Sequence, residues 1–116
     1  MNMHEMDLIK TLGSLVDDAL LVIGHDLIIT NANPASIRLL GDKVIGTNLN
    51  DVIIYSGLAE ELAACLDSQK PVEFTATPTN NHYRHIRARM MIWGEDTLIV
   101  LLLDMTLQHN LEKMRR

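Results

Sequence analysis

Two histidines stand at a spacing that can serve metal binding. His82 and His85 form an H-x-x-H pair, and on a helix two ligands at this spacing would share one face. The second histidine lies in a predicted strand at 83–93, where residues three apart point to opposite sides of the sheet. A metal site needs ligands that converge on one point. We therefore expect no metal site at this pair.

A single cysteine and a series of arginines are the other candidates for chemistry. Cys65 has apolar helical neighbours and no base close in sequence, which favours a small buried hydrophobic residue over a nucleophile. Arg84, Arg87 and Arg89 form a basic strand on which an anion could dock. Pairing with Glu73 across a hairpin is the commoner outcome. With no nucleophile–base pair in the chain, we expect no catalytic activity.

Two polar residues after the last apolar run are the most informative. Asp104 follows six apolar residues, 98–103, so it is expected at the rim of the core. A partly buried carboxylate there needs a partner. Thr106 is placed to N-cap a following helix, because its hydroxyl can accept a hydrogen bond from an amide two or three residues on.

The composition limits the class of protein. The 116 residues suit one domain, and a net charge of −5 disfavours general nucleic-acid binding. Aromatic residues are only 3%, so aliphatic side chains must fill the core. No apolar run is long enough to cross a bilayer, and the N-terminus lacks the apolar stretch of a signal peptide. The single cysteine fits a reducing, cytoplasmic compartment.

An amphipathic helix is predicted at the N-terminus. Leu8, Leu12 and Leu15 recur at helical spacing on one face of residues 1–18. This stripe has to be covered by the sheet of its own chain or by a partner. We expect it to pair with its copy in a second chain, so that the protein is a homodimer.

Strands and short helices follow the first helix. Segments 19–23 and 27–30 predict a hairpin. After it, Asn33 is a good N-cap and Pro34 a good first residue of a helix. Two further helical segments are predicted, a single turn at 49–53 and a helix at 58–68.

The second half of the chain is rich in strands. Phe74 and Ala76 alternate with polar residues, so one face of their strand is expected to be wet. Strands are predicted at 72–77, 83–93 and 97–103. The five strands, with helices between their two groups, predict an α+β fold: an antiparallel sheet with short helices on one face, plus amphipathic helices at both ends.

Segments in this order resemble the PAS family. Residues 31–35 (NANPA) resemble the motif that opens the first core helix of PAS domains, and residues 45–53 resemble the family's I-G-x-x-L-x-D-V-I segment. Residues 104–106 resemble the D-[IVM]-T motif that joins a PAS core to its output helix. The resemblance covers roughly residues 7–116. With the amphipathic dimerisation helix at 1–18, it implies a PAS core at 19–106 and the start of an output helix at 107–116.

The last residues indicate the kind of output. Residues 111–116 (LEKMRR) resemble the stretch that leads into the dimerisation helix of phosphate-type (PhoR-like) sensor histidine kinases. The resemblance implies a sensory and signal-coupling domain of a two-component kinase, whose partner is the downstream dimerisation and histidine-phosphotransfer helix. In the family, the residue matching Asp104 holds the strand-to-helix junction by bonding nearby backbone or an arginine. Cyclic-dinucleotide enzymes and transcription regulators share this ending and are the alternative outputs.

Cofactors of the family are not expected here. The flavin branch carries an Asn-Cys-Arg-Phe segment, and haem branches use a histidine on the helix at 58–68; neither is present. A filled aliphatic core is favoured over a ligand pocket between the helices and the sheet. If a small-molecule pocket exists, its walls are expected to include Ile28, Leu40, Leu62, Phe74 and Met90.

Overall fold

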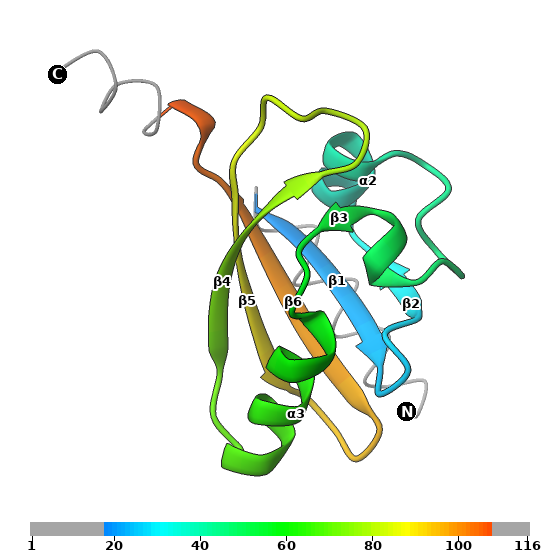
Figure 1. Ribbon diagram of the computed structural model, residues 1–116. Helices are drawn as coiled ribbons and strands as arrows, with labels where there is room; N and C mark the ends of the chain where they lie inside the picture. The colour runs from blue at the N-terminus through cyan, green and yellow to red at the C-terminus, as the bar shows by residue number, and fades with distance from the viewer. Residues whose placement is uncertain (1–17, 108–116) are drawn as a thin grey trace, which may run out of the picture.

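The computed structural model describes residues 18–107 (Figure 1). The predicted helices at 1–18 and 107–116, with Leu8, Leu12 and Leu15, therefore lie outside the described residues, apart from Asp18 and Leu107. The described elements are β1 (Ala19–Gly24), β2 (Ile29–Ala32), α2 (Pro34–Leu40), the 3₁₀ turn η1 (Leu49–Asp51), β3 (Ile53–Ile54), α3 (Leu58–Ser68), β4 (Val72–Pro78), β5 (Ile86–Ile92) and β6 (Thr97–Asp104).

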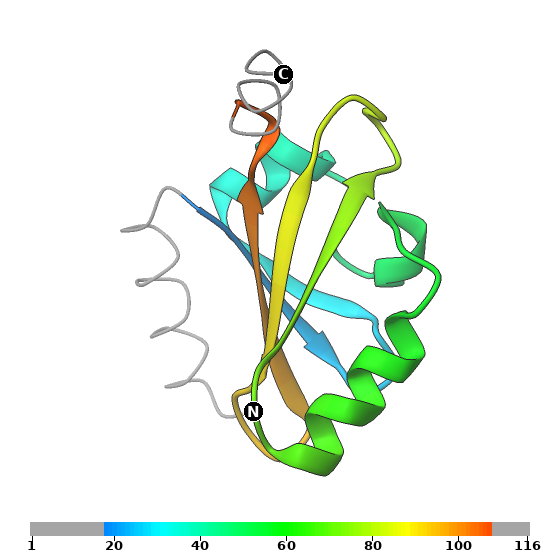
Figure 2. The same ribbon diagram turned by 60° about the vertical axis from the view of Figure 1, so that its left-hand side comes forward.

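The strands form one antiparallel sheet in the order β2-β1-β6-β5-β4-β3. The first and last strands in sequence, β1 and β6, pair with each other inside the sheet. Helices α2 and α3 and the turn η1 contribute to the main buried cluster on one face (Figures 1 and 2). This confirms the predicted α+β class. Among the described residues, no helix is long and apolar enough to cross a membrane.

The sheet has six strands, so the prediction of five was wrong. The additional strand, β3, pairs Ile53 with Pro78 and Ile54 with Thr77. The predicted helical turn at 49–53 is shorter, because η1 ends at Asp51. A strand of two residues is too short to show the alternation by which strands are recognised. Its partner lies more than twenty residues away in sequence.

The second strand begins later than predicted. Leu27 has a φ of 68°, and its amide bonds the carbonyl of Gly24 at 3.0 Å, so the turn extends through Leu27. Ile28 lies outside the strand and forms an isolated bridge with Asn48, and β2 starts at Ile29. As a result Leu27 and Ile29 are buried while Ile28 is half-buried.

Helix α2 begins where the sequence predicts. Pro34 is its first residue, and the Asn33 side chain accepts a hydrogen bond from the Ser36 amide at 3.0 Å, which confirms the N-cap. The same Asn33 oxygen also accepts from the Leu20 amide at 2.9 Å. The Ser36 hydroxyl, which is buried, donates to the Leu20 carbonyl at 2.6 Å. The cap therefore fixes α2 against β1.

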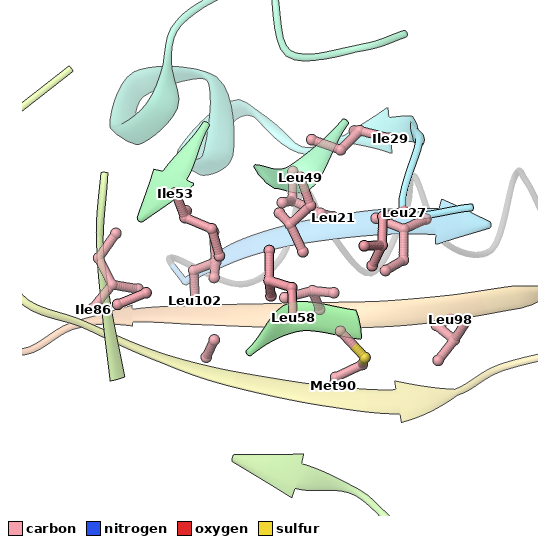
Figure 3. Packing of buried hydrophobic residues seen from close by; sticks show 14 of the residues in the cluster. Leu21, Leu27, Ile29, Leu49, Ile53, Leu58, Ile86, Met90, Leu98 and Leu102 are labelled. Atoms are coloured by element: carbon pink, nitrogen blue, oxygen red, sulfur yellow. The ribbon is translucent and has the colours of Figure 1, made fainter. Parts of the chain in front are cut away.

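Aliphatic side chains fill the core between the sheet and the helical layer. Figure 3 shows Leu21, Ile29, Leu49, Ile53 and Leu58 gathered over the inner face of the sheet. All five are buried almost completely. Burial along β4 alternates as predicted, with Phe74, Ala76 and Pro78 inside.

A smaller apolar cluster lies on the opposite face of the sheet. Leu20, Val22 and Ile99 are buried there, and the half-buried Leu101 packs against them. The strand register explains on which face each residue lies. Leu101 pairs with Leu20 of the smaller cluster, whereas Leu102 pairs with Ala19 of the main cluster. The apolar run 98–103 is therefore not buried throughout, since Leu103 is 40% exposed.

Candidate functional site

The polar residues at the end of β6 form a hydrogen-bonded junction. One oxygen of the Asp104 carboxylate accepts from Nη1 of Arg84. The other accepts from the Thr106 amide at 3.0 Å and from the Thr106 hydroxyl. An aspartate that bonds the amide two residues on forms an Asx turn. Asp104 therefore has both kinds of partner expected of it, a backbone amide and an arginine.

Thr106 links the junction back to the sheet. Its hydroxyl oxygen accepts from the His85 amide at 2.9 Å, and the Met105 amide donates to the His85 carbonyl at 2.7 Å. These bonds continue the β5–β6 pairing, which ends at Ile86 and Asp104, beyond both strands. The amides that Thr106 was expected to cap lie outside the described residues. The chain leaving β6 is thus held by the residues that precede β5.

The junction is more exposed than a rim position suggests. The side chains of Arg84 and Asp104 are 43% and 36% exposed, so solvent screens their ion pair. Partial burial alone would raise the pKa of Asp104, but the hydrogen bonds from Thr106 and the pairing with Arg84 outweigh it. The net result is a pKa below the ordinary 3.8. Asp104 is therefore a carboxylate at neutral pH, and it can accept hydrogen bonds from both neighbours.

A groove of about 410 Å³ lies beside this junction. Arg84, Leu102, Leu103 and Asp104 form one side of it, and the start of β1 and helix α2 form the rest. The place where the described chain begins, at Asp18, and the place where it leaves the sheet, at Asp104, thus share one groove. The remaining lining residues are Asp18, Ala19, Ala35, Arg38 and Leu39.

Solved structures with the same arrangement identify the fold. A PAS domain from a two-component sensor histidine kinase superposes with a TM-score of 0.67 at 11% identity, over 87% of this chain and 96% of that one. The chain has a PAS fold. The PAS domain of the quorum-sensing receptor RpfR from Cronobacter turicensis, in complex with BDSF, gives a TM-score of 0.65 at 18% identity, covering 78% and 96% of the two chains.

A LOV protein from Rhodobacter sphaeroides shares the PAS fold as well. Its TM-score is 0.70 at 15% identity, over 95% of this chain and 72% of the LOV chain. No protein-family model matches the sequence, and no curated protein sequence does. At these identities the similarity is one of fold.

Four of the five predicted pocket residues belong to the main buried cluster of the PAS core. Leu40, Leu62, Phe74 and Met90 are all buried and lie in that cluster. Ile28 is not part of it, because the positive φ of Leu27 shifts the alternation by one residue. Placing Ile28 on the pocket wall was therefore wrong, and Leu27 and Ile29 occupy the core at this point.

The histidine pair lies in the β4–β5 loop of the PAS core. The predicted strand 83–93 begins only at Ile86, so placing His85 in a strand was wrong. No group of three or more metal-ligating side chains occurs within residues 18–107. The loop starts after Pro78, and the chain around His85 is held by Thr106 and Met105.

Cys65 and Arg89 have structural roles in this fold, whereas placing Arg84 on the same basic strand was wrong, because β5 begins only at Ile86. Cys65 is fully buried, its sulfur lies 3.6 Å from the Met90 carbonyl oxygen, and burial raises the pKa of its thiol. Arg89 lies opposite Glu73 in the β4–β5 register and approaches it to 3.7 Å. The predicted cross-strand pairing is therefore confirmed.

Several polar partners were not anticipated from the sequence. Tyr55 stacks on Phe74 with ring centroids 4.4 Å apart, and its hydroxyl donates to Glu61 at 2.9 Å. This hydrogen bond is the main cause of a raised Tyr55 pKa. Asn80 donates from its side chain to the Leu39 carbonyl at 3.3 Å. Each pair joins residues from different parts of the chain. Of these residues, only Asn80 could have been singled out from the sequence, because asparagine side chains often form hydrogen bonds in loops.

Proposed function

We propose that this PAS domain is a signal-coupling module, which relays a conformational change in its core to the helix that follows Thr106. The observation that supports this most is the junction at the end of β6. Asp104 joins the chain leaving the sheet to Arg84, and Thr106 joins it to His85. A junction held by a few side-chain hydrogen bonds, most of them exposed, can adopt a second arrangement at low cost, as a switching element requires.

The output we propose is a two-component sensor histidine kinase, either cytoplasmic or membrane-bound, with this domain in the cytoplasm. The similarity of residues 111–116 to the stretch before a kinase dimerisation helix supports it, and a histidine kinase PAS domain is among the similar structures. In this proposal the domain itself is not an enzyme. It acts on the downstream dimerisation and phosphotransfer helix.

A ligand-binding regulatory domain is the second candidate. The RpfR PAS domain, which has a similar fold, was solved in complex with BDSF. In our chain the corresponding layer between sheet and helices is lined by apolar residues including Leu40, Leu62 and Met90. We propose that neither haem nor flavin binds there, so that any ligand would be a small apolar molecule. Native mass spectrometry of the purified domain separates the two candidates, because a retained ligand would favour the second.

The junction variant Asp104→Ala tests the coupling role. It should lower the free energy of unfolding by only about 1 kcal/mol, because the group is exposed and its partners can turn to water. In the full-length protein it should change the ratio of kinase to phosphatase activity more than the melting temperature. Melting curves and autophosphorylation assays measure the two effects. If the Asp104→Ala protein folds normally and is still regulated normally, Asp104 only ends strand β6 and has no coupling role.

Two controls belong to this test. Asp96→Ala removes an exposed carboxylate from the turn at the other end of β6 and should leave both quantities unchanged. Acid supplies the second control. Because the folded-state pKa of Asp104 is lowered, its contribution to stability is present above pH 3.8 and is lost as the pH falls through the lowered pKa. The difference in stability between wild type and Asp104→Ala should therefore shrink in acid.

We also propose that the domain forms a homodimer through the stripe of Leu8, Leu12 and Leu15. The helical spacing of these leucines supports this proposal, because an apolar stripe on one face of a helix has to be covered. Sedimentation over a range of concentrations should show monomer–dimer exchange, and Leu12→Glu should shift it to monomer because a charge would enter an apolar interface. A wild-type protein that stays monomeric at high concentration would contradict this proposal.

A further inference from the structure

The β4–β5 loop, residues 79–85, contacts both the helical layer and the junction. Near its start, the Thr79 amide donates to the Val52 carbonyl at 3.0 Å and the Thr79 hydroxyl donates to the Asp51 carbonyl at 3.1 Å. At its end, Arg84 holds Asp104. Figure 1 shows the loop arching from the end of β4, past α2, to the start of β5. One short segment therefore touches η1, α2 and the exit from the sheet.

The contact with α2 provides a hydrogen-bond donor for a backbone carbonyl at the C-terminal end of the helix. The last four carbonyls of a helix have no partner within it, and Leu39 is the penultimate residue of α2. The Asn80 side chain donates to this carbonyl at 3.3 Å from 41 residues away in sequence. Asn80 thus caps the C-terminal end of α2 from the loop.

The loop between its two ends is internally hydrogen-bonded. The Asn81 amide donates to the Pro78 carbonyl at 3.3 Å, and the Arg84 amide donates to the Asn81 carbonyl at 3.3 Å. The Asn81 side chain accepts from the Tyr83 amide at 3.1 Å. These bonds connect Asn81, the neighbour of Asn80, to Arg84 within the loop.

We propose that the β4–β5 loop is a mechanical link that sets the geometry of the Asp104 junction according to the position of α2 and η1, with Asn80 as its positioning residue. The proposal rests on the coupling function above and adds the route by which the core reaches the exit. A shift of α2 moves Asn80, the braced loop carries the shift to Arg84 and His85, and these release or hold Asp104 and Thr106.

Amide hydrogen exchange on the 116-residue chain tests the link directly. Asn80→Ala removes the donor, and Asn80→Asp replaces the donating nitrogen with an oxygen at the same volume. Both should speed exchange of the Met105 and Thr106 amides about two- to fivefold, the effect expected for loss of one exposed hydrogen bond. The mid-sheet amides of Met90 and Val100 should keep their rates, because they report opening of the whole sheet.

A matched asparagine controls for loss of a polar surface group. Asn50 is exposed in η1, and Asn50→Ala should leave the junction amides unchanged. Unchanged Met105 and Thr106 rates in both Asn80 variants would overturn the link, as would an equal acceleration at Met90 and Val100. If the Asn80 variants fail this test but Asp104→Ala still alters regulation, the proposed coupling function is retained. Only the proposed route through the β4–β5 loop is then rejected.

Discussion

Leu102→Ala is expected to lower the free energy of unfolding by about 2–5 kcal/mol, the range for truncating a buried leucine. Leu102 is 1% exposed, and Figure 3 shows its side chain in the core near Ile53. Its neighbours across the sheet are Ala19 on β1 and Ala88 on β5. These small side chains cannot close the space that the leucine leaves, so a cavity should remain.

Leu103→Ala is the matched control for this prediction. It removes the same atoms from the next residue of the same strand, but Leu103 is 40% exposed on the opposite face. We expect a smaller loss, of about 1 kcal/mol, because part of the removed side chain already lies in water and no enclosed cavity is left. Urea unfolding of the three proteins measures both values. Equal losses for the two variants would show that the face assignment of β6 is wrong.

Local patterns predicted much of this fold from the sequence. Asn33 and Pro34 mark the start of α2 because a cap and a first-turn proline act within four residues. The alternation around Phe74 identified β4 for a similar reason, since side chains in a strand change face at every residue. Such signals depend on only a few neighbouring residues, and the structure confirms these two elements.

The errors arose where distant residues decide the local structure. Ile53 and Ile54 form a strand only because β4 offers an edge to them. Ile28 was placed on the wrong side because nothing in the sequence announces the positive φ of Leu27, which a non-glycine residue seldom adopts. Pairing and backbone strain of this kind are set by tertiary contacts.

The residues of the candidate site were likewise only partly predictable from the sequence. Asp104 and Thr106 could be named in advance because they follow an apolar run and match a motif. Their partners Arg84 and His85 precede the junction by about twenty residues. That they face Asp104 follows from the β5–β6 register, which the sequence does not specify.

Helix α2 depends on side chains outside itself. It has seven residues, which is too short for a helix to be stable in water without tertiary contacts. Asn33 and Ser36 fix its first turn to Leu20 of β1. Asn80 bonds its last turn from the β4–β5 loop. The strength of these two attachments differs, because the first is buried and the second is exposed. In its hydrogen bonds, the N-terminal end is therefore the more firmly attached end of the helix.

Asn33→Ala should consequently cost about 2–4 kcal/mol, more than an ordinary helix cap. Loss of a cap alone costs about 1 kcal/mol, and stranding a buried polar group adds about 1–3 kcal/mol. The Asn33 oxygen accepts from the amides of both Leu20 and Ser36. Its side-chain nitrogen donates to the Asp18 carbonyl at 2.9 Å. Thermal and urea unfolding measure the loss.

Two variants separate the buried network from simple capping. Asn48→Ala removes the N-cap of η1 and a side-chain bond to the Asp26 carbonyl at 3.3 Å. Both bonds are exposed, so the change should cost no more than about 1 kcal/mol. Asn33→Asp keeps the accepting oxygen and should recover part of the loss. If Asn33→Ala and Asn48→Ala proved equally mild, the network would not hold α2 to β1. The helix would then lack the fixed end that the loop mechanism requires, because movement at Asn80 needs a pivot at Asn33.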